Sequence, residues 1–242
     1  MRQIHLPGDP EITVEIRVNT RARRLSLRVS QLDGRVTMTL PKCASASEAR
    51  GFACEKEHWI RCQLGKRPQE IIPRIGGQIL LEGQQVPIVG LSGRAVRFQD
   101  GQLQVPGDAD RVPIRTAAYL KTLARERLSR ACDHYSGLLG VDVKGITMRD
   151  TRSRWGSCTT DGKLMFSWRL IMAPKDVLDY VAAHEVAHLL EMNHSPPYWA
   201  VVAGIYPGYK IPRQWLRKNG AVLHSYRFAQ LTTAPSSEHI MQ

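Results

Sequence analysis

The sequence predicts an α+β fold, with a β-rich N-terminal part and a second part built mainly on helices. Short segments of alternating apolar and polar residues fill the region from 11 to 40, and glycine-punctuated apolar segments fill the region from 78 to 105. Most of the longer stretches with helical periodicity come after residue 112. The chain of 242 residues is long enough to bury the core of one large domain or of two small ones.

The β-rich part is expected to hold short strands and one helix. Ser45 or Ser47 can cap this helix, because a serine hydroxyl accepts from the free N–H groups of the first turn, and the helix runs to about Gly65. We expect this region to span 1–107 and the segment Gly107-Asp108-Ala109-Asp110 to be a linker. The expected strands are 12–16, 25–29, 36–40, 78–81, 86–89, 95–98 and 103–105.

The second part, expected over 108–230, begins with a long helix over 113–138. Two strands should follow, over 145–158 and 163–171, and the Asp-Gly pair between them is typical of a β-hairpin turn. Three more helices come after the hairpin. The tail, 231–242, has the small and polar residues of a disordered segment.

The helix that starts after Pro174 carries the pattern His184-Glu185-Val186-Ala187-His188. On a helix, His184 and His188 lie on one face, so both imidazoles can reach one metal ion with bonds of about 2.1 Å. Glu185 lies beside the first histidine, where its carboxylate can reach a water on the metal without binding the metal. This pattern is the zincin signature, with two zinc ligands and a general base. The alternative is a buried helix with two structural histidines.

A catalytic zinc site usually has three protein ligands, and three residues are candidates for the third. Glu191 would continue the row of the two histidines on an unbroken helix, which rises about 10 Å over seven residues, too far for convergence on one ion. His224 would require a later helix to return to the site. We favour His194, because Asn193 can end the helix in a left-handed conformation and Ser195-Pro196-Pro197 can begin the next one.

The strand expected before the hairpin carries Arg152 and Arg154, which are two positions apart and would therefore share one face. Either arginine could contact a substrate carboxylate, a phosphate or a developing oxyanion. The alternative is that both are solvated charges on a basic protein. A strand beside the metal site could also bind an extended peptide along its free edge.

Composition favours a soluble cytoplasmic protein with no membrane partner. The 5 cysteines are odd in number and form no Cys-x-x-Cys pair, which favours reduced thiols over disulfides or a cysteine zinc site. The N-terminus has no apolar run of signal-peptide length. No segment approaches the roughly eighteen consecutive apolar residues that a membrane span requires.

The formal net charge is +12, with 34 Lys and Arg against 22 Asp and Glu. Such an excess favours a polyanionic partner, a nucleic acid or a nucleotide, although it can also serve solubility alone. The cations gather in three clusters, which are Arg17, Arg21, Arg23, Arg24 and Arg28; Arg115, Lys121, Arg125, Arg127 and Arg130; and Lys210, Arg213, Arg217 and Lys218.

Several motifs together resemble the YgjP-like metallopeptidase family, which is related to the SprT-like zincins. The resemblance covers about residues 20–225 and implies a zinc hydrolase, with His184, His188 and His194 as ligands and Glu185 as base. Tyr198 stands where the family often has Phe, and its hydroxyl could contact substrate. The motifs are Arg154-Trp155-Gly156-Ser157-Cys158, Trp168-Arg169-Leu170, Ala173-Pro174, the His-Glu-x-x-His pattern, Asn193-His194-Ser195 and Tyr198-Trp199, with Arg24-Leu25-Ser26-Leu27-Arg28-Val29, Pro41-Lys42 and Lys56-Glu57-His58-Trp59-Ile60 upstream.

These observations predict a zinc-dependent metallopeptidase with a zincin-like catalytic domain that hydrolyses protein or peptide substrates. Zn²⁺ would activate water and stabilise the oxyanion, and Glu185 would move the proton to the leaving amine. One alternative is a nucleotide phosphohydrolase (pyrophosphatase), although the sequence has no Gly-rich phosphate loop and no carboxylate-rich magnesium site. The other is a nucleic-acid-associated protein with structural zinc, which would have a closed four-ligand site.

Overall fold

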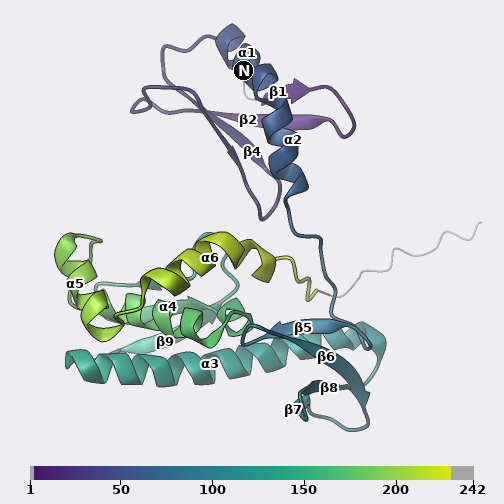
Figure 1. Cartoon of the computed structure of the whole chain (residues 1–242), viewed down its shortest axis with the longest axis vertical. Coiled ribbons are helices and arrows are strands. Elements are labelled where there is room, and N and C mark those ends of the chain that lie inside the picture. Colours follow the sequence, from purple (N-terminus) through teal and green to yellow (C-terminus); the bar gives the residue numbers. More distant parts are fainter. Residues whose placement is uncertain (1–2, 230–242) are drawn as a thin grey trace, which may run out of the picture. The chain divides into compact units, whose positions relative to one another are not determined.

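The computed structural model describes residues 3–229 of the chain, and the predicted α+β class is confirmed. The chain divides into two compact units, Met1–Gln69 and Glu70–Gln242, here called unit 1 and unit 2 (Figure 1). The tail expected to be disordered, 231–242, lies outside the described residues. Within residues 3–229, no helix is both long enough and apolar enough to cross a membrane.

Unit 1 is a four-stranded sheet in the order β1-β2-β4-β3, followed by two short helices. Strands β2 and β4 pair in parallel and the other pairs are antiparallel. Ser45 caps the first helix through a reciprocal capping box with Glu48, but the expected single helix is broken in two at Lys56. The elements are β1 (Gln3–Leu6), β2 (Ile12–Val18), β3 (Ser26–Val29), β4 (Val36–Leu40), α1 (Ala46–Glu55) and α2 (Glu57–Gly65).

Unit 2 begins with a second four-stranded sheet, in the order β5-β6-β8-β7, which leads into the long helix α3 (Val112–Leu139). The division between the units differs from the expected boundary after residue 107. The reason is that Ile79, Ile88 and Leu103 from this sheet belong to the same apolar core as α3. The strands are β5 (Gln78–Leu81), β6 (Gln84–Leu91), β7 (Arg97–Gln99) and β8 (Gln102–Pro106).

A three-stranded sheet in the order β10-β11-β9 follows α3. The predicted hairpin is present, because β10 (Gly156–Cys158) and β11 (Lys163–Ser167) are antiparallel and Gly162 takes a φ of +82° in their turn. The expected strand over 145–158 is wrong, because β9 (Gly145–Arg149) and β10 lie on opposite sides of β11 and a loop joins them. The expected strand over 163–171 is also too long, since a 3₁₀ turn occupies Trp168–Met172.

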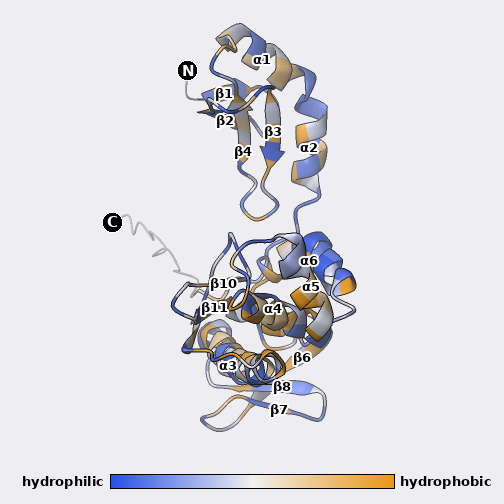
Figure 2. Ribbon diagram, turned by 90° about the vertical axis from the view of Figure 1, so that its left-hand side faces the viewer, coloured by the Kyte–Doolittle hydropathy of each residue, from blue (hydrophilic) through white to orange (hydrophobic). Residues whose placement is uncertain are grey.

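Three helices complete unit 2, namely α4 (Lys175–Ala187), α5 (Pro196–Ile205) and α6 (Lys210–Leu223). Helix α4 contacts α3, α5, α6 and strand β10, so it lies at the centre of the unit (Figures 1 and 2). Most of α4 is buried, including Tyr180, Ala183 and Ala187. A helix that is apolar on most sides is suited to such a central position.

Candidate metal centre

The last turn of α4 presents two imidazoles to a common space. His184 lies in that turn and His188 is the residue that caps the helix, with ring centroids 5.1 Å apart. The helix therefore ends several residues before Met192-Asn193, where we expected it to end. Glu191 consequently does not continue a row of ligands along an unbroken helix.

His194 completes a cluster of three imidazoles. It lies between α4 and α5, and its Nε2 is 3.1 Å from Nε2 of His184. The possible ligand atoms of His184, His188 and His194 all lie within 4.8 Å of one another. Two nitrogens bound to one tetrahedral ion at about 2.1 Å would be about 3.4 Å apart, so this spacing suits a shared ion. The structure thus brings the three predicted ligands together.

A backbone hydrogen bond orients the second histidine. Nδ1–H of His188 donates to the carbonyl oxygen of Glu191 at 2.9 Å, which leaves Nε2 with its lone pair for a metal. Glu191 therefore contributes a carbonyl that holds a ligand in place.

His224, the other candidate for the third ligand, lies elsewhere in unit 2. Its ring packs against Trp155 with centroids 4.8 Å apart, and burial together with Arg169 lowers the pKa of His224 to about 4. Within residues 3–229, the one group of side chains found close enough to share a metal is the cluster of His184, His188 and His194.

Burial keeps His184 and His188 in the form that binds metals. It lowers the pKa of His184 to about 3, with further lowering by the nearby His188, His194 and Arg213. Burial also lowers the pKa of His188 below its ordinary value. Neutral imidazoles are the ligating form, so these two ligands need lose no proton at pH 7.

Glu185 follows His184 in α4, and it is buried, with an exposed fraction of 6%. Burial raises the pKa of its carboxyl to about 8, although the positive charge of Arg154 acts in the opposite direction. Strand β10 approaches it closely, because a Cβ atom added at Gly156 would lie 2.5 Å from Oε1 of Glu185. Gly156 is therefore the glycine that makes room for the glutamate.

The two arginines of the predicted substrate-binding set lie in the loop between β9 and β10, so they do not share the face of a strand. Both are exposed. Arg154 acts electrostatically on Glu185, whereas Arg152 acts on His224. Of the two arginines, Arg154 is therefore the one that lies near Glu185, the predicted general base.

Tyr198 does not offer its hydroxyl to a substrate, contrary to the expectation from sequence. The side chain is fully buried, and its hydroxyl donates to the carbonyl oxygen of His184 at 3.0 Å. Its ring stacks on His188, with centroids 4.4 Å apart and an interplanar angle of 23°. Tyr198 thus packs between the histidines and positions two of them.

The sequence profile described as YgjP-like, metallopeptidase domain, matches residues 23–219, which is most of the chain and includes all of these site residues. The chain belongs to the YgjP-like metallopeptidase family. Membership makes it a peptidase that depends on a metal ion. Among curated proteins, none matches the chain significantly.

One solved structure that matches is the crystal structure of the metallopeptidase zymogen of Pyrococcus abyssi abylysin. It is 19% identical, the match covers 38% of this YgjP-like chain and 93% of that chain, and the TM-score is 0.35.

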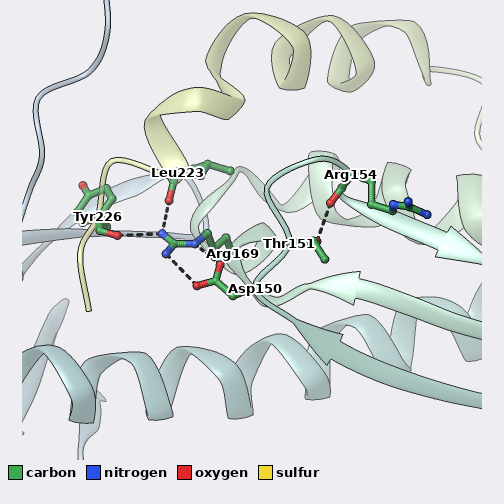
Figure 3. A network of polar contacts seen from close by, with 6 residues as sticks. All are labelled: Asp150, Thr151, Arg154, Arg169, Leu223 and Tyr226. Atoms are coloured by element: carbon green, nitrogen blue, oxygen red, sulfur yellow. Dashed lines mark hydrogen bonds and ion pairs between the residues drawn. The ribbon is translucent and has the colours of Figure 1, made fainter. Parts of the chain in front are cut away.

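Sequence reasoning assigned no role to Arg169, although it stands in one of the quoted YgjP-like motifs. The side chain is 9% exposed and forms a two-pronged ion pair with Asp150, at 2.6 Å and 3.1 Å. Its Nη1 also donates to the carbonyl oxygens of Leu223 and Tyr226 (Figure 3). Arg169 thereby fastens the end of α6 to the first residue of the loop that carries Arg154.

The loop itself is closed by a second bond. The hydroxyl of Thr151 donates to the carbonyl oxygen of Arg154 at 2.8 Å, and Figure 3 shows the Arg154 side chain directed away from the Arg169 network. The arginine is thus held by its backbone, and no hydrogen bond or ion pair of its guanidinium is found within residues 3–229.

Proposed function

We propose that this YgjP-like chain is a zinc-dependent endopeptidase in which His184, His188 and His194 hold the metal and Glu185 is the general base. The observation that carries this proposal is the convergence of three imidazoles within 4.8 Å, with a buried carboxylate next to the first of them. Three histidine ligands are the donor set of a catalytic zinc site that keeps a fourth position for water.

The residues present fit zinc chemically. Imidazole nitrogen suits Zn²⁺, and the bond from His188 to the Glu191 carbonyl is the kind of outer contact that usually fixes a metal-binding tautomer. When bound, the ion supplies Lewis acidity to the substrate carbonyl and lowers the pKa of water at the site.

Glu185 carries the proton transfers of the proposed mechanism. Its carboxylate takes a proton from the water that attacks the peptide carbonyl, and later gives that proton to the leaving amine. Since burial raises the pKa of this carboxyl, its ionised form depends on positive charge nearby, which Arg154 supplies in part and a bound metal ion would add to. We propose that the exposed guanidinium of Arg154 also contacts the substrate.

Strand β10 supports an extended peptide as the substrate. It pairs with β11 alone, so among the described residues its other edge carries no strand. A peptide added along that edge would pass Glu185, since Gly156 of β10 packs directly against this side chain.

The test compares wild type and Glu185→Gln on an unfolded protein, on a protein with DNA, and on nucleoside triphosphates. We expect wild type to cleave the unfolded protein, and the variant to lose about 10²–10⁴-fold in rate while retaining zinc. Hydrolysis of nucleoside triphosphates would instead indicate the phosphohydrolase. Equal peptidase activity in the variant would rule out Glu185 as the base.

A further inference from the structure

Helix α6 exposes a row of cations that the proposed chemistry does not use. Lys210, Arg213, Gln214, Arg217 and Lys218 line a surface groove of about 580 Å³. Their spacing of three, four, seven and eight residues places them on one side of the helix. The other side is fixed by packing, since Pro212, Gly220 and Leu223 are buried. Figure 2 shows the largely hydrophilic character of α6.

These cations have no acidic counterpart nearby in the sequence. No Asp or Glu occurs between Glu191 and Glu238, so α5 and α6 contain none. Within residues 3–229, the ion pairs found involve none of the four cations of the groove. The groove is therefore a surface with uncompensated positive charge, which attracts anionic groups.

One end of α6 is linked to the metal site through an aromatic ring. The guanidinium of Arg213 lies 4.3 Å from the ring centroid of Trp199. That ring stacks on His194, with centroids 5.8 Å apart and an interplanar angle of 30°. The cationic row thus starts one side chain away from the third ligand.

The other end of α6 approaches the strand proposed to bind substrate. A Cβ atom at Gly220 would lie 2.9 Å from the ring of Trp155, the residue directly before β10. Helix α6 therefore extends from the His194 side of the site to the residue that precedes the edge strand.

We propose that the α6 groove selects peptide substrates with acidic side chains close to the cleaved bond. This inference rests on the proposed peptidase function. Arginine binds a carboxylate with two parallel hydrogen bonds, and lysine adds a point charge. An exposed ion pair contributes little by itself, so the preference requires several pairs and weakens with salt.

A peptide fits the groove better than a polynucleotide does, because both ends of α6 meet elements of the peptide-cleaving site. Nucleic acid is the competing occupant, and the test includes it.

The experiment compares two fluorogenic peptides that differ only in having Glu or Gln on either side of the cleaved bond. At low salt, we expect wild type to prefer the Glu peptide by about tenfold in kcat/KM, mainly through a lower KM, which corresponds to about 1.4 kcal/mol. In Arg217→Gln/Lys218→Gln this ratio should fall close to one. Within residues 3–229, no contact of Arg217 or Lys218 with the three histidines or with Glu185 is found.

The matched control, Arg94→Gln/Arg97→Gln, removes the same charge at the start of β7 and in the turn before it, and β7 lies across unit 2 from α6 (Figures 1 and 2). It should keep the wild-type ratio. A wild-type ratio of one, a ratio that survives in the groove variant, or an equal loss in the control would overturn the proposal.

A binding measurement separates this inference from the proposed function. Fluorescence anisotropy of the same two peptides on Glu185→Gln protein reports the groove even where wild type cleaves neither peptide. Preferential binding of the Glu peptide that disappears with the additional Arg217→Gln/Lys218→Gln changes supports the groove. Equal binding of the two peptides, together with groove-dependent binding of a single-stranded DNA oligonucleotide, would overturn it in favour of nucleic acid.

Discussion

Gly156 shows how closely single residues constrain the proposed base. Glu185 is buried against the backbone of β10, and its Oε1 occupies the space that a larger residue would need. The zincin pattern and the spacing to His194 were readable from the sequence. The role of Gly156 was not, because it arises from a contact between residues that are far apart along the chain.

Gly156→Ala should displace the Glu185 carboxylate and lower kcat by about 10–100-fold, since small misplacements of a catalytic group are costly. Zinc content should stay at the wild-type level. Steady-state kinetics with metal analysis measures both quantities. Gly204→Ala is the control, because no atom lies within 4 Å of a Cβ at that helical glycine. Unchanged kcat in Gly156→Ala would contradict the close approach.

Tyr198→Phe should cost about 1 kcal/mol of the free energy of unfolding, because it removes the bond to the His184 carbonyl. Peptide hydrolysis should fall by no more than a few-fold, since the hydroxyl does not face a substrate. Urea unfolding and peptide kinetics test the two statements. A loss of more than a hundredfold in kcat with normal stability would restore Tyr198 as a substrate contact. The bond from Tyr198 to His184 could not be predicted from the sequence, because its acceptor is a backbone carbonyl.

At the scale of elements, periodicity predicted helices better than strands. The long helix expected over 113–138 is Val112–Leu139, and the helix expected after Ser195 is Pro196–Ile205. The prediction of one strand over 145–158 is wrong because the chain leaves the sheet after Arg149. The ion pair between Asp150 and Arg169 stabilises the chain at the point where it leaves the sheet. A contact between residues this far apart cannot be predicted from a local sequence pattern.

Arg169→Leu should lower the free energy of unfolding by about 3 kcal/mol, because it leaves two carbonyl oxygens and Asp150 without their donor. Urea unfolding measures the change. Arg130→Leu is the matched control, since its ion pair with Glu126 is exposed and should contribute less than about 1 kcal/mol. Equal losses in the two variants would show that Arg169 is no more than a surface charge.

Glu82 joins the β5–β6 turn to two helices, through Arg127 of α3 and Lys175 of α4. Burial raises the pKa of Glu82, but hydrogen bonds from these cations outweigh it and hold the pKa below its ordinary value of 4.5. The unfolded chain therefore takes up the proton first as pH falls. The stability that the Glu82 carboxylate contributes is fully present above pH 4.5, the ordinary pKa of the unfolded chain. It is lost as the pH falls through the lower pKa of the folded chain.

Glu82→Gln should consequently be less stable than wild type at pH 7, and the difference should shrink as the pH falls below about 4.5. Urea unfolding across this pH range measures it. A difference that stays constant or grows towards acid pH would contradict the assignment of these ion pairs.

At the scale of the whole molecule, the sequence predicted a β-rich region before the metal-binding part but placed its end too late. The alternating pattern of β5, β6 and β8 shows that each strand has an apolar face, but it does not show which half of the chain that face packs against. Only the shared core with α3 shows that they belong to unit 2. The polyanionic partner inferred from the charge of +12 stays a prediction.

Zinc should stabilise one unit and leave the other unchanged, because the three histidines all belong to unit 2. At free zinc about a thousandfold above Kd, the stabilisation is about 4 kcal/mol. Hydrogen exchange of the zinc-loaded and chelated protein should show added protection around α4 and α5, with none in β1–β4. Equal protection of both units would contradict a site confined to unit 2.

X-ray absorption at the zinc edge is the most direct test of the proposed metal centre, because it counts the ligands of the ion. We expect three imidazole nitrogens at about 2.0–2.1 Å and one exchangeable oxygen, with one nitrogen lost in His194→Ala. A fourth protein ligand, or a spectrum unchanged in His194→Ala, would contradict a catalytic zinc held by His184, His188 and His194.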